Sequence, residues 1–492
     1  MRIFNKDPFA QHNAEEEIKF IDDIFYEPAY YRGLKDTILN NGSRFLLGQR
    51  GDGKSMVIYK LLNDITKDNN ALVLLITRFD NIPLVNNEQF LLYKIAQMMT
   101  IEIAKRLFLN KKARKKIDDY LMKRYNLYLQ CFYDIDFADE FIEKAREIKR
   151  IHRKNLWKRI YNRKILGIAN NLLNTSINVL AAIIKDSFSN MPLQEAIKIE
   201  FLSEMKLTEI RKISFKEADT LNKDNYIKII SDLSKIGKSL GLESVVVLFD
   251  KLDEFQELRG DIAATASFCQ EILTDTDLLL DSNIAVVFSL WSELKREASI
   301  LGARFDKFGE ISVTLENDEI IKLINKRLKY FAKDKNNPPT FETLIKIESQ
   351  RTDILDIAAK SPRTLIRLLG VIYNKEQNRE GECFTPDIIN KALLSYCKTF
   401  DFLSLHPHAK NRQDLTQWIN KLLKVGKSEF TATELQKSLG LKGKTVISYI
   451  KSLTEFDLIR DTFITDENES PIYVVIEPRI VYLMRHQVLN LD

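Results

Sequence analysis

The chain has 492 residues, of which 45% are hydrophobic and 29% are charged, and its formal net charge is +5. This length exceeds one ordinary domain, and this composition excludes a disordered or fibrous protein. The polar start lacks the apolar core of a signal peptide and the four cysteines lack Cys-x-x-Cys spacing, so we expect a cytoplasmic protein with free thiols.

A glycine-rich loop follows the polar and aromatic lead of residues 1–42. An apolar run at 44–47 precedes this loop, and a helical pattern follows it. Strand, loop and helix in this order are typical of a Walker A phosphate-binding loop, in which backbone N–H groups and a helix N-terminus surround the phosphates. Lys54 is expected to reach the β- and γ-phosphates and Ser55 to bind Mg²⁺. The predicted nucleotide-binding residues are Gly48, Gln49, Arg50, Gly51, Asp52, Gly53, Lys54, Ser55 and Met56.

A basic helical insertion is predicted after a buried strand at 71–77 and a helix at about 88–109. From 111 to 222 strand-like runs are almost absent. Within this stretch, residues 144–164 carry ten Lys and Arg against one Glu, with Trp157 and Tyr161 among them. Such a segment suits a phosphate backbone, an anionic membrane surface or a solvated helix face.

Residues 165–184 are apolar enough to raise the question of a transmembrane helix. However, Asn170, Asn174 and Asn178 recur at every fourth position and form one polar stripe on a helix. This stripe favours packing against another helix over insertion into a membrane.

The apolar run at 244–249 ends in Asp250 and has the pattern of a Walker B strand. An acid at the carboxyl end of such a strand lies beside the phosphate loop, where it can bind Mg²⁺ through water. Asp253 and Glu254 come next and are candidates for orienting or deprotonating the attacking water.

Further strands are predicted at 283–289 and 310–315. Ser289 ends the first of them, where its hydroxyl can contact the γ-phosphate or the attacking water. The five strands predict an α/β fold of three layers with a parallel sheet in the order 5-1-4-3-2.

A helical lid is predicted at 317–400, beginning with an amphipathic helix at 317–332. Pro362 suits the first turn of a later helix and places Arg363 at its start, where it would face the nucleotide or lie on the surface. Residues 401–413 look like a linker, and His406 and His408 alone make a poor metal site.

The final segment, 414–492, has the pattern of a winged helix. Helices are predicted at 415–423, at 434–439 and from 442 to about 456. Thr431 or Thr433 would cap the second helix. A hairpin is predicted at 458–465 and 472–476. The third helix would enter the major groove of DNA. Alternatively, the module packs on its own ATPase domain or on a partner protein, which the acidic hairpin turn favours. The outward residues predicted for DNA contact are Lys442, Lys444, Thr445, Ser448 and Lys451.

These patterns divide the chain into five parts. Residues 1–110 and 223–316 form the two parts of an ATPase core, 111–222 the insertion, 317–400 the lid and 414–492 the winged-helix domain.

The chain resembles the AAA+ and STAND superfamilies of P-loop ATPases and their ASCE sheet order. Besides the Walker A loop and Asp250, the residues that occur in family order are Ser289 at a sensor-1-like position, Arg304 at a finger-like position and Ser361-Pro362-Arg363 at a sensor-2-like position. The core, lid and winged helix resemble the origin-recognition branch, whereas Asp250-Lys251-Leu252-Asp253 is similar to the Asp-Asp-Leu-Asp motif of KAP-type ATPases.

This resemblance implies Mg²⁺-dependent hydrolysis of ATP, and the preference for ATP over GTP rests on it alone. It implies a homo-oligomer in which Arg304 acts on the neighbouring site, a protein effector, and a setting in anti-phage defence, as in stand-alone bacterial members. One departure is Lys251, which replaces the usual acid and cannot act as a general base. The alternative is a nucleotide-switched DNA-binding protein in which hydrolysis is incidental.

Overall fold

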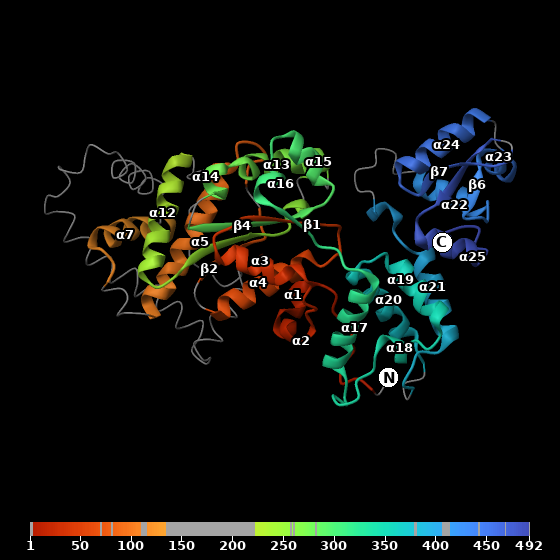
Figure 1. Cartoon of the computed structure of the whole chain (residues 1–492), viewed down its shortest axis with the longest axis horizontal. Coiled ribbons are helices and arrows are strands. Elements are labelled where there is room, and N and C mark those ends of the chain that lie inside the picture. The colour runs from red at the N-terminus through yellow and green to blue at the C-terminus, as the bar shows by residue number, and fades with distance from the viewer. Residues whose placement is uncertain are drawn as a thin grey trace. The chain divides into compact units, whose positions relative to one another are not determined.

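The computed structural model describes residues 3–68, 71–79, 82–109, 116–133, 222–255, 258, 261–280, 283–377, 381–405, 414–440, 443–467 and 469–491. The chain forms two compact units (Figure 1). The sheet unit contains Ala29–Gln49 and Lys54–Val313, and the helical unit contains Met1–Pro28, Arg50–Gly53 and Thr314–Asp492.

The sheet unit is built on five parallel strands in the order β2-β3-β4-β1-β5. This is the predicted order read from the other edge, so the predicted fold class is confirmed. The strands are β1 (Arg44–Gly48), β2 (Ala71–Ile76), β3 (Ser244–Phe249), β4 (Ile284–Trp291) and β5 (Glu310–Ser312). β4 is longer than predicted, so Ser289 lies inside it, and β5 is shorter, because the chain leaves the sheet after Val313 donates to Leu47.

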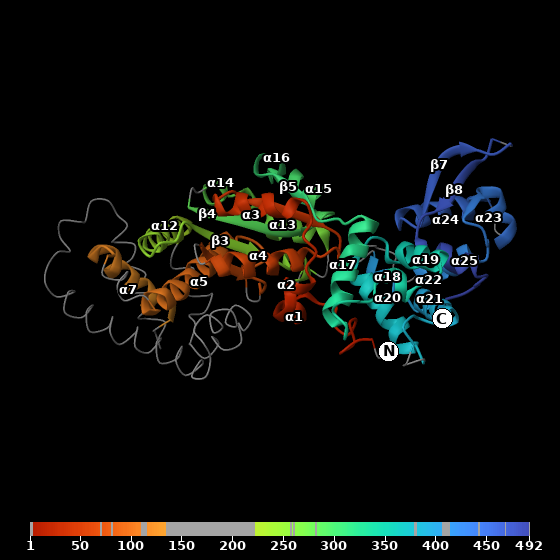
Figure 2. The same cartoon turned by 60° about the horizontal axis from the view of Figure 1, so that its bottom comes forward.

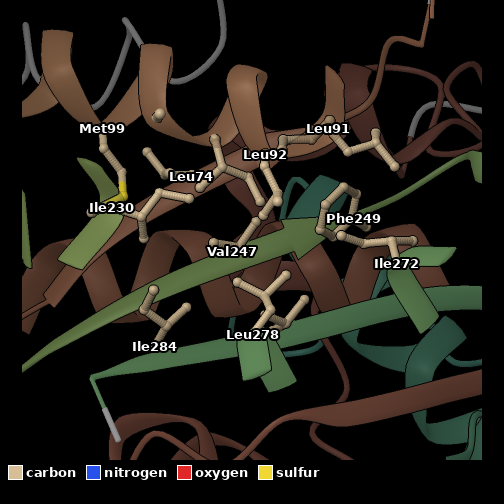
Figure 3. Packing of buried hydrophobic residues seen from close by; sticks show 14 of the residues in the cluster. Leu74, Leu91, Leu92, Met99, Ile230, Val247, Phe249, Ile272, Leu278 and Ile284 are labelled. Atoms are coloured by element: carbon tan, nitrogen blue, oxygen red, sulfur yellow. The ribbon is translucent and has the colours of Figure 1, made fainter. Parts of the chain in front are cut away.

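Helices cover both faces of this sheet because alternate side chains of its strands point to opposite sides. Leu74, Val247 and Phe249 point to the face covered by α5 (Glu88–Leu109), α12 (Lys223–Ser239) and α13 (Ile262–Thr274), as Figure 3 shows. The other face is covered by α3 (Tyr30–Leu39) and α4 (Lys54–Asp68), which lie side by side (Figure 2). The Tyr31 hydroxyl joins these two helices by donating to Asp64 over 2.8 Å.

The remaining elements of the sheet unit are short connections and the beginning of the predicted insertion. They are α7 (Asp119–Tyr133), η3 (Leu252–Glu254), α14 (Thr276–Leu279), α15 (Leu294–Ile300) and α16 (Phe305–Phe308). α7 packs on α5 and α12, where the Tyr128 hydroxyl donates to Asp232 over 2.6 Å and Arg124 forms an ion pair with the same carboxylate.

Two predictions about the insertion lie outside the described residues, namely the basic segment 144–164 and the apolar segment 165–184. Among the described residues, none of the helices combines the length and the apolar character needed to span a bilayer. Cys269, Cys383 and Cys397 are free thiols, as expected.

The helical unit combines the predicted lid and winged helix with the first residues of the chain. Its N-terminal elements are α1 (Ala14–Glu17), η1 (Ile18–Phe20) and α2 (Ile21–Ile24). Its lid helices are α17 (Asn317–Phe331), α18 (Phe341–Leu344), α19 (Glu348–Ala358), α20 (Pro362–Lys375) and α21 (Pro386–Lys398), followed by η5 (Phe402–Leu405).

The first residues of the chain are attached to α17 through Arg327. This buried guanidinium forms an ion pair with Glu17 over 2.5 Å and donates to the carbonyl oxygen of Gln11 over 2.6 Å. Nearby, Phe4 forms an isolated bridge with Ala332. A buried cation needs such partners, so these contacts attach the first residues to α17. Met1–Pro28 therefore belongs with the lid, whereas the sequence-based division placed it with the core.

The winged-helix module contains three helices, a three-stranded antiparallel sheet and a last helix. The elements are α22 (Leu415–Leu423), β6 (Glu429–Thr431), α23 (Ala432–Leu439), α24 (Gly443–Glu455), β7 (Ile459–Thr465), β8 (Pro471–Val475) and α25 (Pro478–Arg485), with the sheet order β6-β8-β7. Thr431, one of the two predicted caps, begins α23 through a capping box with Glu434. β6 and α25 were not predicted; β6 is only three residues long.

Candidate nucleotide-binding site

The Walker A loop joins β1 to α4, with Lys54 as the first residue of the helix. The side chain of Lys54 is 9% exposed, and its ammonium group donates to the carbonyl oxygens of Gly48 and Gln49 over 2.7 and 2.9 Å. Gly51 and Gly53 have φ values of +94° and +99°, which other residues rarely adopt. Glycine at these two positions therefore allows the tight backbone conformation of the loop.

Trp291 holds the start of this loop and was not singled out from the sequence. Its indole N–H donates to the side-chain oxygen of Gln49 over 2.5 Å, and it lies opposite Gly48 in the pairing of β4 with β1. The next residue, Ser292, donates its backbone N–H to the carbonyl oxygen of Gly48 over 3.2 Å. The sequence does contain a tryptophan two residues after Ser289. It was overlooked because the predicted strand ended at Ser289.

Asp250 lies buried at the carboxyl end of β3, with an exposure of 2%. Its backbone N–H donates to Ile76 over 3.0 Å, which fixes it beside the adjacent strand β2. Burial raises the pKa of its carboxyl group, and the hydroxyls of Ser289 and Ser55 act in the opposite direction. The predicted metal and sensor residues are thus close together, where β3, β4 and the start of α4 meet.

Two buried oxygen atoms in this place have no hydrogen-bond partner of good geometry: Oδ2 of Asp250 and Oγ of Ser289. The Ser289 hydroxyl is near enough to influence the pKa of Asp250, but the two groups do not meet the geometry of a hydrogen bond. Orphaned acceptors are costly in a protein interior, and a carboxylate oxygen is a preferred Mg²⁺ ligand. The residues present therefore fit a hydrated Mg²⁺ held by Asp250 and Ser55.

The two candidates for activating water follow Asp250 in η3. Lys251 adopts a left-handed conformation, with φ of +64°, and turns the chain away from β3. Glu254 is exposed, whereas the side chain of Asp253 lies outside the described part of the chain. The choice between these two acids stays a prediction.

Arg304 lies at the surface of the sheet unit, just before α16. Its guanidinium is 58% exposed and forms two hydrogen bonds with the carboxylate of Asp306, over 2.8 and 2.9 Å. The pKa of Asp306 is lowered by these hydrogen bonds. Arg304 is thus a surface residue with a partner in its own chain.

Within the helical unit, the first turn of α20 contacts Gly51. Ser361 caps this helix, and its Oγ accepts from the backbone N–H of Thr364 over 3.3 Å. Arg363 is half-buried and donates its backbone N–H to the carbonyl oxygen of Gly51 over 3.4 Å. Arg363 thus lies in the first turn of α20, as the sequence predicted for this helix start, and its role toward a nucleotide stays a prediction.

The candidate DNA-contacting residues share one face of α24. Lys444, Thr445, Ser448 and Lys451 are exposed, and Lys442 lies outside the described residues. The opposite face of the helix is buried in the module through Val446, Tyr449, Ile450 and Leu453.

Comparisons with known proteins reveal only distant structural likenesses. No family model and no curated protein matches the sequence. The chain is similar to ORC1 of Aeropyrum pernix in complex with DNA, with 12% identity, 99% of each chain covered and a TM-score of 0.36. It is also similar to ORC2 of Aeropyrum pernix in ADPNP and ADP complexes, with 9% identity, 99% and 98% coverage and a TM-score of 0.38.

A third likeness is to Cdc6p of Pyrobaculum aerophilum, with 12% identity, 99% and 100% coverage and a TM-score of 0.30. These TM-scores are too low to support a functional inference. The fold assignment rests on the strand order, and the function is argued from the site.

Proposed function

We propose that this protein binds ATP with Mg²⁺ and hydrolyses it. The observation that carries this proposal is the buried carboxylate of Asp250, which has an orphaned oxygen and lies beside the hydroxyls of Ser55 and Ser289. Lys54, the residue before Ser55, begins the helix that follows the glycine-rich loop. A phosphate-binding loop next to a strand-terminal acid is the arrangement that Mg²⁺-nucleotide chemistry requires.

Each group has a distinct task in this proposal. Bound Mg²⁺ would supply positive charge to the β- and γ-phosphates, and Ser55 and Asp250 would hold it. The ammonium group of Lys54, now on the carbonyls of Gly48 and Gln49, would pair with the same phosphates. Asp253 or Glu254 would orient the attacking water, because Lys251 cannot act as a base.

Two arginines complete the proposed site. Arg363 would contact the γ-phosphate, as the resemblance to a sensor-2-like position implies. Arg304 would act on the site of a neighbouring copy in a homo-oligomer, for which its exposed position is suited. The choice of ATP, a protein effector and a setting in anti-phage defence rest on the resemblance to AAA+ and STAND proteins.

The test is nucleotide binding and turnover by the Lys54→Ala variant. We expect its affinity for Mg²⁺-ATP and its turnover to fall by at least about 100-fold, because a charged phosphate contact is lost. Lys67→Ala is the matched control, because Lys67 is an exposed lysine in the last turn of the same helix. Unchanged turnover in Lys54→Ala would refute the site.

A second candidate function is DNA binding controlled by nucleotide occupancy. The row of Lys444, Thr445, Ser448 and Lys451 on the exposed face of α24 favours it. Its test is duplex DNA binding at several salt concentrations. This function is supported by a steep salt dependence that becomes weaker in Lys444→Ala/Lys451→Ala, or when Arg150, Arg153 and Lys154 are changed. An absence of binding at low salt excludes it.

A further inference from the structure

The tip of strand β7 presents two large apolar side chains to solvent. Phe463 is 92% exposed and Ile464 is 63% exposed. The pairing of β7 with β8 is irregular between Asp461 and Thr465, and Phe463 has a φ of +58°. Two local hydrogen bonds hold this bulge, from the N–H of Phe463 to Asp461 over 2.8 Å and from the N–H of Ile464 to the Thr462 hydroxyl over 3.2 Å.

Folding alone does not account for this arrangement. A bulky residue with positive φ is a genuine outlier, and an exposed phenyl ring adds no buried apolar surface. A bulge and charged side chains are known to protect an edge strand from aggregation, but exposed Phe and Ile have the opposite effect. Strain combined with apolar exposure indicates a surface kept for contact with another molecule.

The charge around this tip indicates the kind of partner. We define the wing as residues 457–470, in which Arg460 is the only base. Its acids are Asp457, Asp461, Asp466, Glu467 and Glu469. Such a surface repels phosphate groups and is complementary to a basic protein segment with apolar side chains. The β7–β8 hairpin can be followed in Figure 2.

We propose that the wing of one copy binds the basic segment 144–164 of a second copy. This segment has ten Lys and Arg and one Glu, and it contains Trp157 and Tyr161. Its positive charge matches the acids of the wing, and its aromatic residues and arginines are the types that dominate protein interfaces. Phe463 is the apolar anchor of the contact. This proposal does not depend on the nucleotide site.

The first experiment is photocrosslinking in the full chain. Benzoylphenylalanine replaces Phe463 in a light-isotope chain, which is mixed with an equal amount of heavy-isotope wild-type chain. We expect light wing peptides joined to heavy peptides from 144–164, and a lower yield at high salt because the contact is charged. Benzoylphenylalanine at Leu489, which is 57% exposed and lies outside the wing, is the control and should give few such products.

Several outcomes would overturn the proposal. These are no heavy crosslinks, crosslinks confined to a single chain, heavy crosslinks only to other segments, and equal yields from positions 463 and 489. Duplex DNA binding that depends on Phe463 in the absence of heavy crosslinks would likewise overturn it, in favour of wedge insertion into DNA.

A second variant separates docking from folding. Phe463→Gly removes the anchor and suits the positive φ, so the unfolding midpoint should stay the same or rise while self-association weakens by about tenfold or more. Leu489→Ala should leave self-association unchanged. Undiminished self-association of the Phe463→Gly chain would contradict the proposal.

Discussion

The hydroxyl oxygen of Ser361 lies only 2.6 Å from the position that a Cβ atom of Gly51 would occupy. No side chain fits at residue 51 without displacing Ser361, which caps α20. Gly53 differs, because its φ is also positive but nothing lies within 4 Å of its Cβ position. Substitutions at these two glycines therefore distinguish the effect of backbone strain from that of a steric clash.

Gly51→Ala should cost more folding stability than Gly53→Ala. Both substitutions place alanine at positive φ, at about 1–2 kcal/mol each, and Gly51→Ala adds the clash with Ser361. Denaturant unfolding of the two variants measures the difference. Adding Ser361→Gly to Gly51→Ala should recover part of the loss, and equal stability of the two alanine variants would show that the contact is unimportant.

Asp250→Asn should lower ATP turnover and raise folding stability. Loss of the carboxylate would remove a proposed Mg²⁺ ligand, so we expect turnover to fall by about 10²–10³-fold. Burial raises the pKa of the Asp250 carboxyl group, so the ionised carboxylate destabilises the folded state at pH values above its unfolded pKa. Protonation at low pH removes this destabilisation, and asparagine removes it at every pH. Turnover and denaturant unfolding at neutral pH measure both effects, with Asp318→Asn, at an exposed acid, as the control. Wild-type turnover of Asp250→Asn would contradict the assigned role.

The ion pair between Glu88 and Lys223 should make folding stability depend on pH. Burial, together with Asp275, raises the pKa of Glu88 from 4.5 to about 7, although the ammonium group of Lys223 is 2.7 Å away. The folded state thus holds this proton more tightly than the unfolded state. The contribution of Glu88 to stability should therefore fall as the pH rises from 4.5 to about 7.

Glu88→Gln tests this expectation because glutamine cannot titrate. The difference in unfolding free energy between the variant and wild type should shift in favour of the variant by about 1–3 kcal/mol as the pH rises from acid to neutral. Denaturant titrations of the variant and of wild type at several pH values give this difference, in which the groups that do not interact with Glu88 cancel. A difference that does not change with pH would exclude a raised pKa.

Arg327→Met should destabilise the helical unit by about 3–5 kcal/mol. It leaves the buried carboxylate of Glu17 without its cation and the carbonyl of Gln11 without its donor. Chemical denaturation measures the loss, and limited proteolysis should cleave the first 28 residues faster. Lys322→Ala breaks the exposed pair with Asp318 and should have no measurable effect. If both variants unfold alike, Arg327 does not attach the N-terminal segment.

Mixing two inactive variants tests whether Arg304 acts between copies. We expect Arg304→Ala and Lys54→Ala each to lose turnover by about 10³-fold. In a mixture, the Arg304→Ala chain supplies a site with an intact Lys54, and a neighbouring Lys54→Ala chain supplies an intact Arg304. Turnover should therefore return in part. No recovery at any ratio, with assembly intact by light scattering, would contradict action between copies.

The sequence alone determined the class of the sheet and the residues at its carboxyl edge. Apolar runs such as Ala71–Ile76 and Ser244–Phe249 are local patterns, and the parallel sheet follows from their succession. The glycine-rich loop, the position of Asp250 at a strand end and the start of α20 are local in the same sense. Each depends on neighbours within a few residues.

Only the tertiary structure decided which distant residues meet. Ser361 lies against Gly51, Trp291 donates to Gln49, and Arg327 attaches the first residues to α17. The orphaned oxygens of Asp250 and Ser289 are also seen only after folding. These pairs are separated by tens to hundreds of positions, and their contacts depend on how whole helices and strands pack. The periodicity of a sequence carries the preferences of each element, but not the geometry between elements.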